Sequence, residues 1–324
     1  MSQVAKLGAA PRQSMGQRMG KTLRIKPRLF WPLFLTAALV LIALLAPVLA
    51  TYDPNQQDLL NSLAPPSAEH WLGTDGQGRD IYSRLLFGLR LDLFGALGAV
   101  LLGFIFGTPL GVITGLLGGL FERVAMRFVD AALAIPPILL IMSVIAVLGR
   151  DYIHSMIALA VIFSFGYIRI GRGEAKMIRQ STHVYAARAI GVSGWRLIYR
   201  HVLPSALPAL IMQIGLFMPV ALLVSASLSY LGLGVQSPQS SLGSMLQAAQ
   251  EVSLNAPWQV LPPGLLLAVA ALILSFLAEA FSDSMNPRGD AESLLVTASG
   301  RLRKQRKPRK TDAEYVLEVN GLSV

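Results

Sequence analysis

The sequence predicts an all-α protein that crosses a membrane several times. Of its 324 residues, 53% are hydrophobic and only 14% are charged, whereas soluble domains carry about 25% charged residues. The hydrophobic residues gather in uncharged runs, at 29–52, 93–121, 131–149, 152–168, 202–250 and 252–278. Each run is long enough to cross a hydrocarbon core of about 30 Å as a helix. A membrane β-barrel would instead show alternating segments of about ten residues, and an ordinary soluble enzyme is excluded.

Six membrane spans are expected, approximately at 32–50, 92–114, 128–149, 152–170, 206–232 and 260–281. The first span follows a basic leader and ends in Val48, Leu49 and Ala50, which resemble a signal-peptide cleavage site. Its full spanning length favours an uncleaved anchor. The chain then divides into a basic N-terminal segment, 1–31, a transmembrane domain, 32–289, and a basic tail, 290–324.

The basic residues indicate how the chain is oriented. Of the 28 Lys and Arg residues, 24 lie before the first span, between the second and third, between the fourth and fifth, or after the sixth. Because basic residues accumulate on the cytoplasmic side of membrane proteins, both termini are expected in the cytoplasm. The net charge of +10 is therefore interpreted as a sign of membrane orientation and lipid contact, and no nucleic-acid partner is expected.

Small residues and prolines predict how the spans pack. Glycines recur every four residues in and after the second span, at Gly103, Gly107, Gly111, Gly115 and Gly119. Such a face lets two helix backbones approach closely in a membrane. Prolines inside the spans predict kinks, at Pro109, Pro136, Pro137 and Pro219.

Two long segments are expected outside the cytoplasm, 51–91 and 233–259. The first ends with Ile81, Leu85 and Leu89 at helical spacing, opposite Arg84. This pattern predicts a short amphipathic helix over 80–90, lying on the outer surface of the membrane.

No catalytic or metal site is expected. The chain has no Cys and only four His, none with metal-ligand spacing. Gly16 and Gly20 precede Lys21 and Thr22, but three residues separate the glycines where a phosphate loop needs four. Four acidic residues lie at predicted span edges, at Asp92, Asp130, Glu279 and Asp283. They are either the coupling sites of an ion-driven carrier or interfacial residues that contact solvent and neighbouring helices, and their terminal positions favour the second interpretation.

The inside loop, residues 182–203, contains the most informative pattern. Its alanines favour a short helix, Gly191 and Gly194 permit a sharp break, and residues 195–201 can form a second helix. Pro204 suits the first turn of the next span. The loop is therefore expected to form a rigid helix–turn–helix between two spans, although an ordinary amphipathic connector is the alternative.

This loop is similar to the cytoplasmic motif of ATP-binding-cassette (ABC) importer permeases. That motif reads Glu-Ala-Ala, three residues, Gly, nine residues, Ile, one residue, Leu-Pro. The matching positions in this sequence are Ala186, Ala187, Gly191, Leu203 and Pro204. Tyr185 replaces the usual Glu and His201 replaces the usual Ile.

Three further segments resemble the second, C-type permease subunit of the dipeptide, oligopeptide and nickel importers. They are residues 72–90, 229–238 and 283–288, where Asn286 replaces the usual Asp. The resemblance covers the chain from about residue 30 to residue 289 and implies a six-helix type I importer permease in the bacterial inner membrane.

The resemblance also implies partners and a function. The partners are a homologous second permease subunit, two ATPase subunits that bind ATP and Mg, and an extracytoplasmic substrate-binding protein. The inside loop would couple the permease to an ATPase, and the two outer segments would receive the binding protein. Short peptides are the expected cargo, with nickel or another small solute as the alternative. An ion-coupled secondary carrier is the alternative from another class, although the uncharged span centres disfavour it.

The last ten residues, 315–324, look like the opening strand of an importer ATPase. A fused ATPase that continues beyond this point and an ordinary tail both stay open.

Overall fold

The structure is a computed structural model that describes residues 27–189 and 191–285. Regular structure in this part of the chain is helical, apart from an isolated bridge between Thr74 and Asp80. The α-helices are α2 (Pro27–Leu44), α3 (Ala46–Leu49), α4 (Ile81–Leu117), α5 (Gly119–Ala134), α6 (Pro137–Leu148), α7 (Tyr152–Arg179), α8 (Thr182–Ala189), α9 (Gly194–Leu197), α10 (Leu203–Tyr230), α11 (Leu242–Glu251) and α12 (Leu261–Met285). Shorter helical turns are η1 (Leu59–Asn61), η2 (Ile198–Val202) and η3 (Pro257–Val260). The all-α prediction is confirmed.

Several helices have the length and composition of membrane spans. Within the described residues, four continuous helices qualify, at Ile81–Leu117, Tyr152–Arg179, Gly194–Tyr230 and Pro257–Asp283. The bent pair α5 and α6 would make a fifth span if it counts as one, and residues Leu29–Leu44 form a shorter apolar helix. A multi-pass membrane protein is thus confirmed, whereas the count of six spans stays a prediction.

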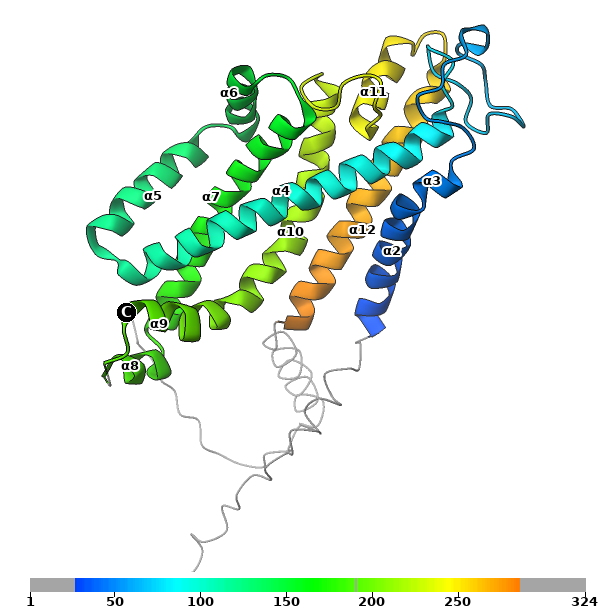
Figure 1. Ribbon diagram of the computed structural model, residues 1–324. Coiled ribbons are helices and arrows are strands. Elements are labelled where there is room, and N and C mark those ends of the chain that lie inside the picture. Colours follow the sequence, from blue (N-terminus) through cyan, green and yellow to red (C-terminus); the bar gives the residue numbers. More distant parts are fainter. Residues whose placement is uncertain (1–26, 190, 286–324) are drawn as a thin grey trace, which may run out of the picture. The chain divides into compact units, whose positions relative to one another are not determined.

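Helices α4 and α7 form the most extensive helix pair (Figure 1). Their contact uses the glycine face that the sequence predicted. A Cβ atom added to Gly107 would lie 2.5 Å from the carbonyl oxygen of Ser164, and one added to Gly111 would lie 2.6 Å from that of Ile168. Such distances leave no room for a side chain, so glycine is what lets the two backbones approach.

Gly119 does not belong to this face. It begins α5 with a φ of +65°, and nothing lies within 4 Å of the position that its Cβ would occupy. Its predecessor Gly118 also has a positive φ, +68°, and ends α4. The two glycines therefore form the sharp turn between α4 and α5, because left-handed backbone is readily adopted only by glycine.

The predicted surface helix over 80–90 is wrong. These residues begin the continuous helix α4, whose N-cap Asp80 accepts a hydrogen bond from the backbone N–H of Ser83 at 2.8 Å. Leu85 and Leu89 are buried, and Arg84 is buried as well. The apolar stripe packs against other parts of the protein rather than against lipid, and Arg84 finds polar partners there.

The third predicted span, 128–149, is not one continuous helix. Helix α5 begins at Gly119, and the axes of α5 and α6 meet at 95°. The break falls at Ile135 and Pro136, both of which have extended ψ angles, 132° and 128°. Because proline forces the preceding residue away from helical geometry, the pair Pro136 and Pro137 produces a break where the sequence predicted a kink.

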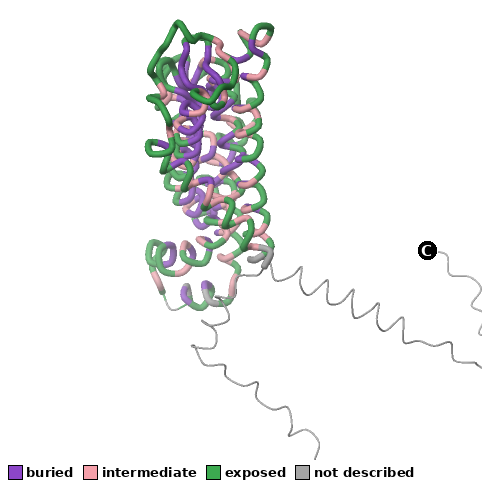
Figure 2. The backbone as a smooth tube through the Cα atoms, turned by 90° about the vertical axis from the view of Figure 1, so that its right-hand side faces the viewer, coloured by how far each residue is buried: buried purple, intermediate pink, exposed green. Residues whose placement is uncertain are grey.

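The buried residues form one main hydrophobic cluster that includes residues from α2, α4, α7, α10 and α12. Figure 2 shows that buried residues follow one another along the interior of the helix bundle and continue into the end that contains residues 51–80. Most of the buried residues of α10 lie between Met218 and Ser229. In the most apolar stretches of the spans that contain α10 and α12, few residues are buried within this chain, so much apolar surface remains exposed there. That surface is suited to contact lipid or another membrane chain.

Some predictions fall outside the described residues. These concern the basic leader 1–26, Asn286 and Arg288 of the third family-like segment, and the tail 290–324 with its ATPase-like end. The predicted domain boundaries at residues 31 and 289 stay predictions.

Candidate functional site

The inside loop folds as two helical arms joined at a glycine turn. The first arm is α8, and the turn contains Gly191, whose φ of +78° requires the left-handed backbone that glycine adopts most readily. The backbone N–H of Val192 donates to the carbonyl oxygen of Ala187 at 3.1 Å and closes the turn. The second arm, α9 and η2, continues directly into α10, with Pro204 in the first turn of α10. The helix–turn–helix is therefore present, and its second arm is a direct extension of a helix long and apolar enough to span a membrane.

The inner side of the inside loop is anchored in the main hydrophobic cluster. Val184, Leu197 and Val202 are buried there, together with Ala187. Leu203 packs partly against the same cluster. Of the five predicted site residues, Ala187 and Leu203 thus both pack in or against the main hydrophobic cluster, whereas Ala186, Gly191 and Pro204 are exposed.

Three aromatic residues are exposed on the inside loop. Tyr185 is 75% exposed, and Trp195 and Tyr199 are each 63% exposed. The rings of Trp195 and Tyr199 stack with centroids 6.1 Å apart. Large aromatic side chains that remain exposed on a buried base are typical of contact surfaces for other proteins. The sequence patterns did not predict this cluster, although the spacing of Trp195 and Tyr199, four residues apart on one helix face, is visible in the sequence.

A charge cluster joins the turn between α4 and α5 to the last part of α7. The carboxylate of Glu122 lies 2.6 Å from Nη2 of Arg172 and 2.6 Å from Nζ of Lys176. Nearby, Nη1 of Arg179 donates to the carbonyl oxygen of Leu116 at 3.2 Å. Because α8 follows α7 after a short turn, this cluster fixes the base from which the inside loop projects.

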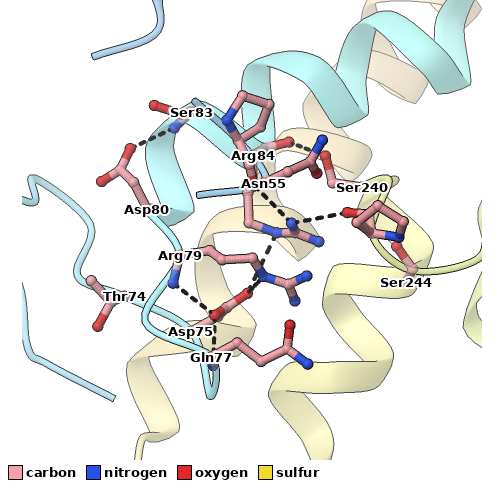
Figure 3. A network of polar contacts seen from close by, with 12 residues as sticks. Asn55, Thr74, Asp75, Gln77, Arg79, Asp80, Ser83, Arg84, Ser240 and Ser244 are labelled. Carbon is pink, nitrogen blue, oxygen red and sulfur yellow. Dashed lines mark hydrogen bonds and ion pairs between the residues drawn. The ribbon is translucent and has the colours of Figure 1, made fainter. Parts of the chain in front are cut away.

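The opposite end of the helices carries a folded cap, which we call the outer cap and which comprises residues 51–80 and 231–260 (Figure 1). Asp75 organises its first part (Figure 3). Its Oδ1 accepts hydrogen bonds from the backbone N–H groups of Gln77, at 2.8 Å, and Arg79, at 3.0 Å. Its Oδ2 accepts from Nε of Arg79 at 2.7 Å and lies 3.5 Å from Nε of Arg84. One carboxylate therefore shapes the loop and pairs with two guanidinium groups.

Arg84 connects the two parts of the outer cap. Its Nη1 donates to the carbonyl oxygens of Pro54, at 2.9 Å, and Pro238, at 3.3 Å. Its own carbonyl oxygen accepts a hydrogen bond from Oγ of Ser240 at 3.0 Å. Nearby, Nε2 of Gln259 donates to the carbonyl oxygen of Thr74 at 2.9 Å. The two predicted outer segments are thus one folded unit, a relationship between distant residues that the sequence patterns did not reveal.

The four acidic residues at the predicted span edges differ in their surroundings. Asp92 is fully buried and contacts the first turn of α11 through the backbone N–H of Leu242. Asp130, Glu279 and Asp283 are exposed. Their positions agree with the interpretation that such residues contact solvent or neighbouring helices. Within the described residues, no group of three or more His, Asp and Glu side chains is arranged to hold a metal ion.

Comparison with known protein families gives two matches. Residues 107–289, more than half of the chain, match the family described as binding-protein-dependent transport system inner membrane component. Residues 14–66 match the N-terminal transmembrane domain of oligopeptide transport permease C. The two matches include the inside loop and all of the outer cap except residues 67–80.

Curated relatives extend over most of the chain. It is 37% identical over 262 residues to the probable D,D-dipeptide transport system permease protein DdpC of Escherichia coli, with 79% of this chain and 88% of that protein covered. It is 36% identical over 256 residues to the dipeptide transport system permease protein DppC of Alkalihalophilus pseudofirmus, with 79% and 84% covered. It is 33% identical over 282 residues to the glutathione transport system permease protein GsiD of Pectobacterium atrosepticum, with 83% and 93% covered.

A solved structure shares the fold. A chain of the MetNI methionine ABC transporter, in an inward-facing conformation, superposes with a TM-score of 0.52 at 20% identity and covers 64% of this chain and 98% of that chain. This similarity supports the type I importer architecture. With the family match and the curated relatives, it establishes that the chain belongs to the binding-protein-dependent transport system inner membrane components, as a multi-pass permease subunit of an ABC importer.

Proposed function

We propose that the chain forms one half of a translocation pathway that imports short peptides across the bacterial inner membrane. The curated relatives named above are permeases for dipeptides, D,D-dipeptides and glutathione, which are all short peptides. The other half of the pathway is a homologous permease subunit, and the exposed apolar stretches of α10 and α12 are suited to pack against it. ATP and Mg bind to two partner ATPase subunits rather than to this chain.

The observation that carries the proposal is the inside loop. Its base is buried with Val184 and Leu197, while Trp195 and Tyr199 are exposed on its outer surface. We infer that these aromatic residues, with Tyr185, enter a groove of one ATPase subunit. Because the second arm continues into α10, a displacement of the docked loop moves a membrane helix directly.

The loop can act in this way only if it binds the ATPase subunit more strongly in one conformation of the importer than in the other. Closure of the ATPases on ATP pulls the loop and stabilises the outward-facing state, and hydrolysis releases that state. The outer cap receives the binding protein on the other side of the membrane. The importer thereby couples delivery of cargo on one side to ATP hydrolysis on the other.

The experiment is to purify the tagged chain from its native membrane and identify the co-purifying proteins by mass spectrometry. With the binding protein present, ATPase activity is then measured in nanodiscs and solute uptake in proteoliposomes. Recovery of a second permease and ATPases, with ATP-dependent uptake of a dipeptide, supports the proposal. Nickel and a free amino acid serve as comparison cargoes.

Either of two results would contradict the proposal. ATP-dependent uptake of nickel without uptake of peptides would show that the protein is an importer subunit but that its cargo is nickel rather than peptides. Recovery of the chain alone, with uptake driven by an ion gradient in the absence of ATP, would favour the secondary carrier and remove the role of the inside loop.

A further inference from the structure

A cavity of about 290 Å³ lies within the outer cap. It is bordered by the loop that contains Asp75 and Arg79, by Arg84 at the start of α4, and by residues of the 232–239 segment and α11. Ligand pockets generally measure about 300–1,000 Å³, so this cavity is at the small end of that range. It has room for a small group or one end of a peptide.

The buried charges around the cavity are unequal in number. Arg79 and Arg84 are 7% and 5% exposed, and the buried acid that borders the cavity with them, Asp75, pairs with both. Glu251 also borders the cavity but is exposed to solvent. On the other side of the loop, Asp80 is engaged by His70 and by the N-terminus of α4. The buried wall therefore carries one more positive than negative charge.

Arg79 has a donor that nothing in the described part of the chain satisfies. Its Nε pairs with Asp75, but its Nη1 is buried and has no hydrogen-bond partner. A buried donor without a partner costs about 1–3 kcal/mol, and more when the group is charged. Figure 3 shows the guanidinium end of Arg79 directed away from the loop backbone and toward α11. The guanidinium group of Arg79 is therefore on the side of the loop where the cavity lies, with Nη1 itself enclosed by protein atoms.

The remaining lining is rich in neutral amides. Five glutamines border the cavity: Gln77, Gln236, Gln239, Gln247 and Gln259. Amide groups can donate to a carboxylate and can also pair with a peptide backbone. An excess guanidinium next to neutral donors is the arrangement that a single carboxylate requires, because guanidinium groups form strong charge-assisted hydrogen bonds with carboxylates.

We propose that this cavity binds one carboxylate group, which is stabilised by the guanidinium groups of Arg79 and Arg84 and by the neutral amides of the lining. Two sources present such a group at this face: the C-terminal carboxylate of a peptide cargo and an acidic side chain of the docked binding protein. The identification of these sources rests on the proposed import function, whereas the binding of a carboxylate does not.

The first experiment uses the purified importer complex in nanodiscs and two small probes, N-acetylglycine and N-acetylglycinamide, which differ in one carboxylate. Ligand-observed NMR titration should detect binding of N-acetylglycine alone. Arg79→Gln should raise its dissociation constant by about tenfold or more, as expected from the loss of a charge-assisted hydrogen bond. Arg90→Gln is the matched control, because Arg90 is an exposed cation on α4 that does not border the cavity. Equal binding of the two probes, or equal effects of the two substitutions, would overturn the proposal.

A second variant keeps the proposal testable if Arg79→Gln fails to fold. Gln247→Glu places a tethered carboxylate in the cavity, so it should abolish binding of N-acetylglycine and raise the melting temperature of the complex. Gln250→Glu is its control, since Gln250 is exposed on the same helix and does not border the cavity. Unchanged probe binding in Gln247→Glu would overturn the proposal.

The source of the carboxylate is identified with the Arg79→Gln complex. If the cargo supplies it, the substitution lowers uptake of a dipeptide but leaves uptake of the C-terminally amidated dipeptide unchanged. If the binding protein supplies it, the substitution weakens docking of the binding protein about tenfold or more, and uptake of both peptides falls together. Failure of the import function is separate, because a complex that binds N-acetylglycine but imports no peptide would contradict the proposed cargo and leave the carboxylate site standing.

Discussion

The carboxylate of Asp92 accepts a hydrogen bond from the backbone N–H of Leu242 at 2.7 Å, across 150 residues of sequence. Leu242 is the first residue of α11, whose N-cap Ser241 accepts from the backbone N–H of Ser244 at 3.0 Å. A buried acid on a membrane helix therefore holds the start of a helix in the outer cap, where a carboxylate is favourable because of the unpaired N–H groups and the helix dipole.

Replacing Asp92 with Leu should destabilise the protein. The substitution leaves the N–H of Leu242 buried without an acceptor, which costs about 1–3 kcal/mol. Asp92→Asn keeps a carbonyl oxygen at this position and should cost less. Thermal unfolding of the purified complex, monitored by tryptophan fluorescence, measures both variants, and an equal loss of stability in the two would show that the hydrogen bond is not the cause.

Gly107→Ala should also destabilise the complex, by about 1–3 kcal/mol through overpacking. The added methyl group would lie 2.5 Å from the carbonyl oxygen of Ser164 and force α4 and α7 apart. Gly98→Ala is the matched control on the same helix, because nothing lies within 4 Å of its added Cβ. This control should be neutral or more stable by up to about 1 kcal/mol, since alanine favours the helix. The same thermal unfolding assay compares the two, and a stable Gly107→Ala variant would contradict the close packing of α4 and α7.

Gly191→Val should uncouple the ATPase from transport while leaving membrane insertion intact. The φ of +78° at Gly191 strains any residue with a side chain, and a β-branched residue there costs about 1–3 kcal/mol. The turn is then expected to change shape, which misplaces the exposed aromatics relative to the ATPase. Stimulation of ATPase activity by the loaded binding protein is the measurement.

Gly194→Ala provides the control for the inside loop. Gly194 begins α9, has open space around its Cβ position, and is not among the residues with positive φ. Its substitution should preserve both insertion and stimulation. If the Gly191→Val complex showed ATPase stimulation and uptake equal to those of the wild type, the rigid turn would not be required for coupling.

Glu122→Gln should weaken the connection between α7 and the turn that joins α4 to α5. The substitution removes the charge that pairs with Arg172 and Lys176. Both basic side chains are partly exposed, so salt screens the pairing. The melting temperature should fall at low ionic strength, and the difference from wild type should shrink as salt is added.

Asp130→Asn is the control for this charge cluster. Asp130 is exposed on the same helix, α5, and takes no part in the ion pairs that Glu122 forms with Arg172 and Lys176. Its substitution should leave the melting temperature nearly unchanged at every salt concentration. A salt-independent effect of Glu122→Gln would mean that the cluster does not act through charge.

Local patterns in the sequence predicted local structure well. The alanines and glycines between Ser181 and Pro204 predicted the two arms and the turn of the inside loop, because helix propensity and backbone freedom act over a few residues. Likewise, the four-residue spacing of Gly103 to Gly115 predicted the close helix face, although the sequence did not identify α7 as the partner. Pro136 and Pro137 predicted a bend but not its angle of 95°, which depends on tertiary packing.

Relationships between distant residues could not be predicted in the same way. Leu85 and Leu89 form an apolar stripe that is equally suited to a membrane surface and to a protein interior, so the pattern alone did not distinguish the two. The contact between Ser240 and Arg84 spans 156 residues, and no periodicity encodes it. The cavity at Arg79 could not be predicted either, because its lining comes from both parts of the outer cap and exists only where these two parts meet.

Helix α4 has 37 residues without interruption, which corresponds to a length of about 55 Å at about 1.5 Å per residue. This length exceeds a hydrocarbon core of about 30 Å. Helix α4 therefore extends as one rod from Arg84, which pairs with Asp75 in the outer cap, to the glycine turn before Glu122. A rocking of this rod by about 10° around its midpoint carries each end about 5 Å in opposite directions, nearly the pitch of one helical turn. Such a rocking would convert a displacement in the outer cap into an opposite displacement beside the base of the inside loop, without any change in the internal structure of the helix.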